Sequence, residues 1–438
     1  MDEQNNFIQK YGKSFCVLPW LRILIDVNGQ CSNCCRHSKV RMESGLPYSL
    51  TTSGLMDIWN SKAMCELRRL MVEGKAVPEC NSCYEKELNG GSSRRLDANW
   101  SYEKTNGFDS IASLKIESEK SNFSLSFAPT EYHIETDNLC NLRCRMCSPR
   151  NSSRIQTDGV HRQRCSNIGQ RRKTVESTAC RHDDSWFKDD SLVEETLFRG
   201  GVPKIVAFSG GEPMINPRVI RIVKRLASES TSQEQNVTLV TNGTVINEEL
   251  LELRHNFRLL SLCVSFDAVG NGGEYIRNGA GRDVVKENIL ELVNVKKNRL
   301  HVMICSTLQA YNALEFCDVL EFCDNNNLIN SPNFVYAPKH CSVNALPAAV
   351  REVAAERLLE FSKKGGRSSA HAAMLANVIQ SNLGKFEPAD LHEFMKFTND
   401  LDFSRGQNIK ETFPELVRLI EQSGYPWIEE TRYWKPGI

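Results

Sequence analysis

Short apolar runs alternate with amphipathic segments between residues 131 and 338. Six of the runs have the length of buried strands: EYHIET, KIVAFS, NVTLVT, LLSLCVSF, HVMICST and NFVYAP. The segments between them place apolar residues every three or four positions, as helices do: PRVIRIVKRLASES, NEELLELRHN and VVKENILELVNVKK. Strands that alternate with helices predict a parallel sheet. Because the strands are almost continuously apolar, we expect both faces of this sheet to be covered.

Six strand–helix units are too few for a closed barrel of eight, so we expect an open, partial (β/α)6 barrel of the α/β class. In such folds the chemistry lies at the carboxyl ends of the strands. The segments expected at this edge, in strand order, are TDNLCNLRCRMC, SGGEP, TNGT, SFDAVG and STLQAYN.

Two regions flank the expected barrel, which we place at residues 125–340. Residues 1–100 contain a predicted hairpin with an Asn-Gly turn, a predicted helix over LMDIWNSKAMCELRRLMVEG and a CxxC pair. Residues 341–438 are predicted to be mostly helical, because AAVREVAAERLLEFSKK and AHAAMLANVIQSNL have helical periodicity on either side of a GGRSS break.

An insertion at about 150–200 is longer than one crossover requires. Its middle is basic and acidic residues follow, a pattern typical of a solvated surface segment. It also holds four residues that can bind metal, but their irregular spacing does not favour a metal site. These residues are His161, Cys165, Cys180 and His182.

The cysteine content changes this picture more than the charge does. Lys and Arg together number 54, as do Asp and Glu, so the charge favours neither nucleic acid nor an anionic membrane as a partner. No apolar run approaches the roughly 20 residues that cross a bilayer, and we expect a cytoplasmic protein. Thiols stay reduced there, so 17 cysteines indicate metal binding or redox chemistry. Isolated cysteines in apolar strands, such as Cys263 and Cys305, are predicted to be small core residues.

Three cysteines, Cys140, Cys144 and Cys147, follow the first expected strand as a C-x3-C-x2-C motif with no fourth ligand nearby. Structural zinc sites take four ligands, commonly as two pairs. A cluster of four irons held by three thiolates instead keeps one iron open to an outside ligand. One loop can supply all three thiolates, while its free backbone N–H groups offset their charge. We therefore favour a 4Fe-4S cluster at this triplet.

The chain resembles the radical S-adenosylmethionine (SAM) superfamily in this triplet, in a Gly-Gly-Glu-Pro motif and in the six-strand run. The resemblance implies that the open iron binds the amino and carboxylate groups of SAM. SAM would then be cleaved to a 5′-deoxyadenosyl radical that abstracts a substrate hydrogen. It also implies a set of SAM-binding residues: Gly210, Gly211, Glu212 and Pro213 at the amino group, Ser265, Asp267 and Asn242 at the ribose rim, Met146 near the adenine and Arg277 at the carboxylate.

Two of these assignments have equally good alternatives, and one departs from the family pattern. Arg277 is explained as well by a surface ion pair as by a SAM carboxylate. Asn242 precedes a glycine, and Asn-Gly is a strong turn dipeptide. Met146 stands where the family usually has an aromatic residue, although a polarizable thioether also packs well against a ring.

The N-terminal cysteines are similar in layout to the twitch domain, the short form of the SPASM extension that carries an auxiliary cluster in some radical SAM enzymes. Its usual place is after the barrel, whereas here the segment comes first. The resemblance implies a second 4Fe-4S cluster held by Cys16, Cys34, Cys80 and Cys83, with Cys31 and Cys35 as alternatives to Cys34. From the residues alone, a zinc ribbon built on Cys31-x2-Cys34 and Cys80-x2-Cys83 is the rival interpretation.

Two classes of function follow from this reading. The first is a radical SAM enzyme that performs oxidative tailoring of a peptide, with dehydrogenation or epimerisation of a sugar-like molecule as the alternative. An electron donor such as flavodoxin or ferredoxin would then be a partner. The second class is a non-catalytic iron–sulfur or zinc regulatory protein. The complete cysteine triplet and the intact Gly-Gly-Glu-Pro motif favour the enzyme.

Overall fold

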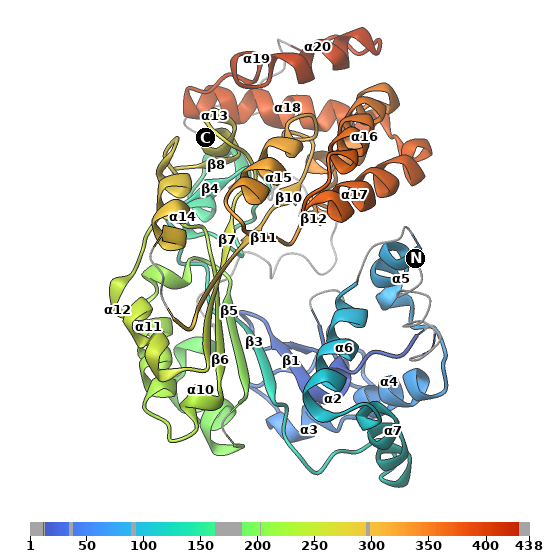
Figure 1. Cartoon of the computed structure of the whole chain (residues 1–438), viewed down its shortest axis with the longest axis vertical. Coiled ribbons are helices and arrows are strands. Elements are labelled where there is room, and N and C mark those ends of the chain that lie inside the picture. The colour runs from blue at the N-terminus through green and yellow to red at the C-terminus, as the bar shows by residue number, and fades with distance from the viewer. Residues whose placement is uncertain are drawn as a thin grey trace.

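The computed structural model describes most of the chain (Figure 1). Cys35 and much of the insertion, including Cys165, Cys180 and His182, lie outside the described residues. The described residues are 12, 14–34, 38–88, 93–162, 186–201, 203–294 and 298–428.

One sheet of eight strands runs through the protein in the order β11-β9-β7-β6-β5-β3-β1-β2. Its first six strands are mutually parallel, which confirms the predicted partial barrel. They are β3 (Glu131–Glu135), β5 (Ile205–Ser209), β6 (Asn236–Thr241), β7 (Leu259–Ser265), β9 (Leu300–Cys305) and β11 (Ile329–Asn330).

The sixth strand of the barrel differs from the predicted one. The NFVYAP run contributes only β12 (Asn333–Phe334), which pairs with β10 (Thr307–Leu308) outside the main sheet. The edge of the main sheet is formed instead by β11, just before Pro332. Hydrogen bonds to the neighbouring segment nevertheless continue past Pro332, because the Ser331 N–H donates to the Ile304 carbonyl and the Asn333 N–H donates to the Ser306 carbonyl, at 2.8 Å each.

Helices cover the outer face of the barrel sheet, as Figure 1 shows. Strand residues on that face, such as Val206, Leu239 and Leu262, have no exposed surface. Buried and partly exposed residues alternate along β3, β5 and β6. The partly exposed residues are those whose side chains point to the other face of the sheet. The covering helices are α10 (Asp190–Glu194), α11 (Pro217–Ala227), α12 (Glu248–Glu252) and α14 (Val284–Asn294).

The inner face of the sheet mixes polar and apolar side chains and stays partly exposed along β3, β5 and β6, whereas β7 is buried on both faces; the prediction of a sheet covered on both faces therefore holds for only part of the sheet. A row across five strands shows this face: His133, Ala207, Thr238, Ser261 and His301 are successive neighbours in register. Layers of side chains fill a closed barrel of eight strands, but an open barrel of six leaves its inner face without that filling.

The N-terminal region joins the barrel through its hairpin. Strand β1 (Arg22–Ile25) lies parallel to β3, and β2 (Cys31–Ser32) lies antiparallel to β1 at the edge of the sheet. The hairpin therefore continues the barrel sheet. The helices of this region are α2 (Leu18–Leu21), α3 (Leu55–Trp59), α4 (Lys62–Val72), α5 (Asn81–Leu88), α6 (Arg94–Asn106) and α7 (Ser110–Lys120).

The single helix predicted from residue 55 is two helices, because two side chains interrupt it. Asn60 hydrogen-bonds through its amide to both the N–H and the carbonyl of Leu125, at 2.8 Å each. Ser61 then caps α4 by accepting a bond from the Met64 N–H. A tertiary contact and a good N-cap residue thus restart the helix.

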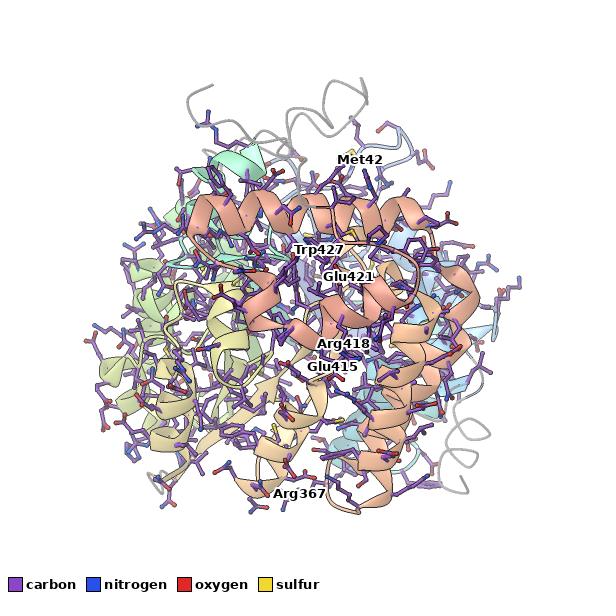
Figure 2. All side chains as sticks on the ribbon, turned by 90° about the horizontal axis from the view of Figure 1, so that it is seen from above. Met42, Arg367, Glu415, Arg418, Glu421 and Trp427 are labelled. Atoms are coloured by element: carbon purple, nitrogen blue, oxygen red, sulfur yellow. The ribbon has the colours of Figure 1, made fainter. Side chains whose placement is uncertain are left out.

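The C-terminal region is helical, as predicted, and has its own apolar core. Seen from above in Figure 2, Trp427 lies against α18, and its Nε1 donates to Asn399 Oδ1 at 2.9 Å. None of the helices in the described residues has the length and apolarity to cross a bilayer. Helix α15 (Phe316–Asn325) connects β10 to β11. The helices of the C-terminal region are α16 (Ala348–Lys363), α17 (Ser369–Ser381), α18 (Pro388–Arg405), α19 (Ile409–Thr412) and α20 (Pro414–Gln422).

Candidate functional site

The three clustered cysteines lie on the loop that leaves the carboxyl end of β3. Part of this loop, β4 (Arg143–Cys144), pairs antiparallel with β8 (Arg277–Asn278) and sets Cys144 opposite Arg277. At the start of α8 (Ser153–Gln156), Ser152 Oγ donates to the Leu142 carbonyl at 2.6 Å, and Ser153 Oγ donates to the Cys140 carbonyl at 3.3 Å. These hydrogen bonds tie the cysteine loop to the start of α8.

The surroundings of the three thiols fit the ligand set of an iron–sulfur cluster. Burial raises the pKa of Cys140 to about 11. A hydrogen bond that the Cys144 thiol donates to Cys147 raises the pKa of Cys144, as burial also does, and lowers the pKa of Cys147. Asn242 Nδ2 lies 3.9 Å from the Cys140 sulfur and Arg277 Nη1 lies 4.0 Å from the Cys144 sulfur. Donors aimed at sulfur favour thiolate, and bound iron supplies the remaining positive charge.

The two glycines of the Gly-Gly-Glu-Pro motif let its backbone run directly against the cysteine loop. The Gly211 N–H donates to the Asp137 carbonyl at 2.8 Å, and the Glu212 N–H donates to the Leu139 carbonyl at 2.7 Å. A Cβ at Gly211 would stand 2.1 Å from the Leu139 oxygen, and Gly210 has a φ of +115°. Only glycine permits this approach.

Gly211→Ala is therefore expected to push the backbone of Leu139 and the adjoining Cys140 out of place. We expect SAM affinity of the reconstituted protein to fall at least about tenfold, equal to about 1.4 kcal/mol. Gly384→Ala is the matched control, because a Cβ at Gly384 meets nothing within 4 Å. Equilibrium binding of SAM measures both variants, and wild-type affinity in Gly211→Ala would show that the close contact is dispensable.

Glu212 links the ends of β5 and β6. Its carboxylate accepts hydrogen bonds from the Thr241 hydroxyl at 2.6 Å, the Asn242 N–H at 2.6 Å and the Met214 N–H at 2.9 Å. The residue is 1% exposed, and burial raises the pKa of the carboxyl. Glu212 thus orients Asn242, and Pro213 beside it is buried. The predicted contact of Glu212 with SAM stays a prediction.

Asn242 does more than form a turn, because its side chain faces the cysteine loop. Its Nδ2 donates to Asn141 Oδ1 at 2.8 Å, and its Oδ1 accepts from the Thr244 N–H at 2.9 Å. The chain thereby brings the end of β6 onto the loop after β3. A role at the ribose of SAM is not tested by this arrangement.

Arg277 forms an ion pair, but its partner is buried rather than on the surface. Its Nε lies 2.8 Å from Asp267 Oδ2, and the Asp267 side chain has no exposed surface. Asp267 also accepts from the Thr307 N–H at 2.8 Å, so it joins the ends of β7 and β9. Arg277 directly follows α13 (Asn271–Ile276), and Ser265 is the last residue of β7, two positions before Asp267. These residues meet at one rim, as their positions predicted.

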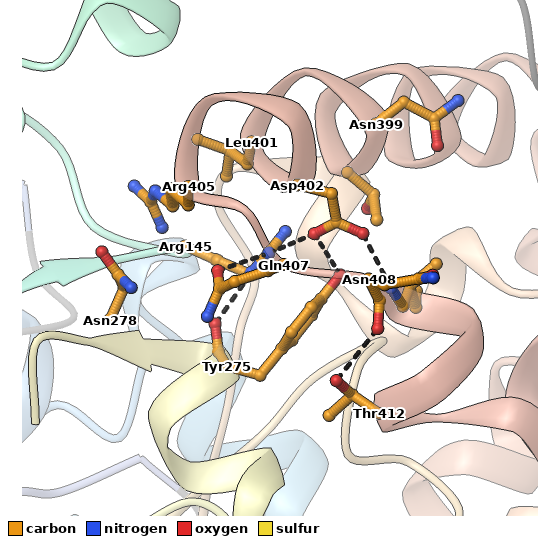
Figure 3. Close-up of polar contacts among 12 residues, drawn as sticks. Arg145, Tyr275, Asn278, Asn399, Leu401, Asp402, Arg405, Gln407, Asn408 and Thr412 are labelled. Carbon is orange, nitrogen blue, oxygen red and sulfur yellow. Dashed lines mark hydrogen bonds and ion pairs between the residues drawn. The ribbon is translucent and has the colours of Figure 1, made fainter. Parts of the chain in front are cut away.

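Arg145 and Asp402 connect the cysteine loop to the C-terminal helices, as Figure 3 shows. Arg145 has no exposed side-chain surface and lies 2.5 Å from Asp402 of α18. Its Nε donates to the Tyr275 carbonyl at 2.8 Å, and the Tyr275 hydroxyl donates to Asp402 at 2.7 Å. Met146, the next residue, packs against both apolar cores. Sequence reasoning missed this pair because 257 positions separate its members.

The four predicted ligands of the auxiliary cluster lie near one another in the N-terminal region, although no three metal-binding side chains among the described residues stand at metal-ligand spacing. Burial raises the pKa of the Cys16 thiol well above its ordinary value, and the nearby sulfurs of Cys34, Cys80 and Cys83 raise it further. Burial likewise raises the pKa of Cys80 to about 12, with contributions from Cys34 and Cys83. Such crowding disfavours four thiolates unless a cationic metal centre binds them, so this donor set fits a cluster.

Cys31 points away from this group. Its thiol donates to the Gly29 carbonyl at 3.6 Å, and its charged neighbours are Asp26 and Lys39 rather than other cysteines. The zinc ribbon needs Cys31 beside Cys34, Cys80 and Cys83, and the surroundings of Cys31 do not favour that set. Cys35 cannot be compared because it lies outside the described residues.

Of the insertion's four residues that can bind metal, the structure describes only His161. Its Nδ1 lies 2.9 Å from Asp158 Oδ1, and Asp158 also pairs with Arg405 of α18 at 3.2 Å. His161 thus belongs to a network that fixes the segment after the cysteine loop to the C-terminal helices.

Comparison with protein families gives two matches. The model described as the radical SAM superfamily matches residues 134–323, and one described as an iron–sulfur cluster-binding domain (SPASM) matches residues 16–84. No curated protein sequence matches significantly. Similar solved structures include Streptococcus suis SuiB, with 14% identity over 79% of this chain and 69% of that one and a TM-score of 0.37. Another is the structure of anSMEcpe with bound AdoMet and Cp18Cys peptide, which has 15% identity over 53% of this chain and 59% of that one and a TM-score of 0.33.

Proposed function

Because the chain belongs to the radical SAM superfamily and carries a SPASM iron–sulfur domain ahead of its barrel, we propose that it is a peptide-modifying radical enzyme. Its cofactors are SAM, a 4Fe-4S cluster and an auxiliary iron–sulfur cluster. When bound, the first cluster and SAM supply a 5′-deoxyadenosyl radical that removes a hydrogen atom from the substrate. The observation that carries the proposal is the packing of the Gly-Gly-Glu-Pro backbone on the cysteine loop at the carboxyl edge of the sheet.

The chain's own residues would hold the cofactors and keep them oriented. Cys140, Cys144 and Cys147 would bind the first cluster. Asn242 and Arg277, the donors that face two of these sulfurs, would steady the thiolates and border the SAM site. The cluster would thus sit among groups that other protein contacts already fix, which lowers the reorganisation needed when SAM binds.

The inner face of the barrel supports a peptide as the substrate. The row from His133 to His301 crosses four strand spacings, or about 19 Å at roughly 4.8 Å each. An extended peptide covers that distance with about six residues, whereas one sugar ring is much smaller. The polar side chains along the row are suited to backbone N–H and carbonyl groups.

Dehydrogenation or epimerisation of a sugar-like molecule remains the second candidate, because hydroxyl groups also suit a polar inner face. The rate of 5′-deoxyadenosine formation separates the two, since a substrate accelerates it above the uncoupled rate. We expect a pool of synthetic peptides to accelerate it and a pool of sugar alcohols to leave it unchanged. Acceleration by the sugars alone would replace the proposed substrate class.

The auxiliary site provides a prediction about iron content. A variant with Cys16→Ala, Cys80→Ala and Cys83→Ala is expected to lose about half of about eight irons per chain, since two 4Fe-4S clusters hold eight. Cleavage of SAM should persist, because these cysteines belong to the other metal site. Iron analysis and 5′-deoxyadenosine formation measure the two properties. Loss of all iron would contradict two independent sites.

We also propose two features of the cellular context. A one-electron donor such as flavodoxin or ferredoxin would reduce the first cluster. The cytoplasm is the proposed compartment, because thiols stay reduced there and this chain has 17 of them.

A further inference from the structure

A network of four charged side chains lies where the N-terminal hairpin meets the cysteine loop. Its centre is Asp26, which directly follows β1 and has no exposed side-chain surface. Its other members are Lys39 of the N-terminal region, Glu135 at the end of β3 and Arg150, three residues after Cys147. Two acids and two bases make the network neutral, so partly exposed charges compensate one another around the buried carboxylate of Asp26.

Asp26 organises the turn of the hairpin with one carboxylate oxygen. Oδ1 accepts hydrogen bonds from the Asn28 N–H at 2.8 Å and from the Gln30 N–H at 3.0 Å. The chain continues from this turn into β2 and then to Cys34. The position of Asp26 thus fixes the start of the segment that bears a predicted ligand of the auxiliary cluster.

The other oxygen of Asp26 reaches the cysteine loop. Oδ2 lies 2.9 Å from Lys39 Nζ and 2.8 Å from Arg150 Nη2. The same Nη2 lies 3.2 Å from Glu135 Oε2. Glu135 stands just before the cysteine loop and Arg150 just after it, so Arg150 joins the two ends of the loop and ties both to the hairpin.

We infer that Arg150 is a positioning residue that locks the hairpin of the auxiliary domain to the loop of Cys140, Cys144 and Cys147. Without it, the hairpin would keep its strand pairing with β3 but lose its link to the loop ends. The consequence for catalysis rests on the proposed function. The rate of electron exchange between two clusters falls steeply with the distance between them. A junction that fixes this distance would therefore keep the rate constant.

An ordinary surface ion pair between domains would behave differently. Exposed pairs contribute roughly 0 to 1 kcal/mol and act only locally. Asp26 is fully buried, and loss of Arg150 leaves its charge with Lys39 as the one remaining ion-pair partner among the described residues. A positioning role therefore predicts that one substitution loosens both the hairpin turn and the cysteine loop.

The test is a double-mutant cycle on the full-length chain without iron, read by amide hydrogen exchange of residues 26–34 and 137–149. Arg150→Met and Asp26→Asn are each expected to accelerate exchange in both segments, on the order of tenfold. The amide that Asp26→Asn introduces keeps an oxygen for the turn, so this substitution removes mainly the charge. The double variant should exchange no faster than the faster single variant, because both substitutions break one connection.

Arg357→Met is the matched control. Arg357 is 36% exposed, like Arg150, and lies 2.9 Å from Glu415, which Figure 2 labels on α20. We expect exchange in residues 26–34 and 137–149 to stay at the wild-type rate in this variant. Two results would contradict the proposed junction. One is faster hydrogen exchange in Arg150→Met that is confined to residues 137–149, and the other is additive effects of the two substitutions in the double variant.

A second readout uses the reconstituted protein. Arg150→Met should keep both clusters, while the spin relaxation of the reduced first cluster, measured by electron paramagnetic resonance, should differ from wild type. Arg150→Lys should restore part of the wild-type relaxation, since a charge returns beside Asp26. Identical relaxation in wild type and Arg150→Met would contradict a positioning role. Failure of the wild-type chain to bind iron would refute the proposed function and leave the exchange test intact.

Discussion

Replacing Cys140, Cys144 and Cys147 together by Ala is expected to abolish cleavage of SAM rather than weaken it. These thiolates are the only anchors that we propose for the cluster that binds SAM. The auxiliary site should keep its iron, about half of the total, because it has four other cysteines. The fold should persist, since the triplet lies on a rim loop held by Ser152, Ser153 and Arg145. The measurements are 5′-deoxyadenosine formation, iron content and circular dichroism.

The matched control is a variant with Cys65→Ala and Cys317→Ala. Both cysteines are partly buried and lie apart from the two sites. Wild-type iron and SAM cleavage are expected in this control. If the folded triplet variant formed 5′-deoxyadenosine well above a blank without enzyme, the triplet would not be the radical-generating site.

Arg145→Met is expected to destabilise the chain without iron by about 3 to 5 kcal/mol, the cost of breaking a buried ion pair by removing one partner. Among the residues that the structure describes, Asp402 would keep the Tyr275 hydroxyl and the Ile409 N–H as its partners for a buried charge. The loop between Cys144 and Cys147 would also lose its attachment to α18. Urea unfolding measures the change in the free energy of unfolding.

Arg357→Met again serves as the comparison. Its pair with Glu415 is partly exposed, so we expect a loss of no more than about 1 kcal/mol. If Arg145→Met lowered the free energy of unfolding by as little as Arg357→Met does, the link between the cysteine loop and the C-terminal helices would contribute little to stability.

The candidate site was predictable from sequence where its residues stand at strand ends. The triplet, the Gly-Gly-Glu-Pro motif, Asn242 and Asp267 each follow a recognisable apolar strand, and parallel strands bring their carboxyl ends to one edge. Their shared location at the rim therefore follows from local patterns and one topological rule.

Features that depend on distant partners were not predictable in this way. Arg145 and Asp402 meet only because α18 packs over the barrel. The pairing of β1 with β3 likewise depends on a choice of neighbour that no local pattern encodes. The partial exposure of the inner face was missed because strands with fully buried outer residues looked apolar throughout. The sixth strand was misplaced because β11 has only two residues, too few to leave a pattern.

Cys263 and Cys305 illustrate the same limit. Each lies in an apolar stretch of sequence, and both were predicted to be core residues. Cys263 is buried, as predicted, whereas Cys305 is only partly buried. Their thiols hydrogen-bond to each other, and neither packs within the two apolar clusters of the described residues. Alternation along β7 and β9 places them on the inner face, and only the sheet register reveals this.

The most direct test of the account is SAM cleavage by the wild-type chain after anaerobic reconstitution with iron and sulfide. We predict about eight irons per chain, and 5′-deoxyadenosine that forms when dithionite and SAM are added. A chain that binds this iron but forms no 5′-deoxyadenosine above the blank without enzyme, with dithionite or with reduced flavodoxin, would contradict the proposal that it is a radical enzyme.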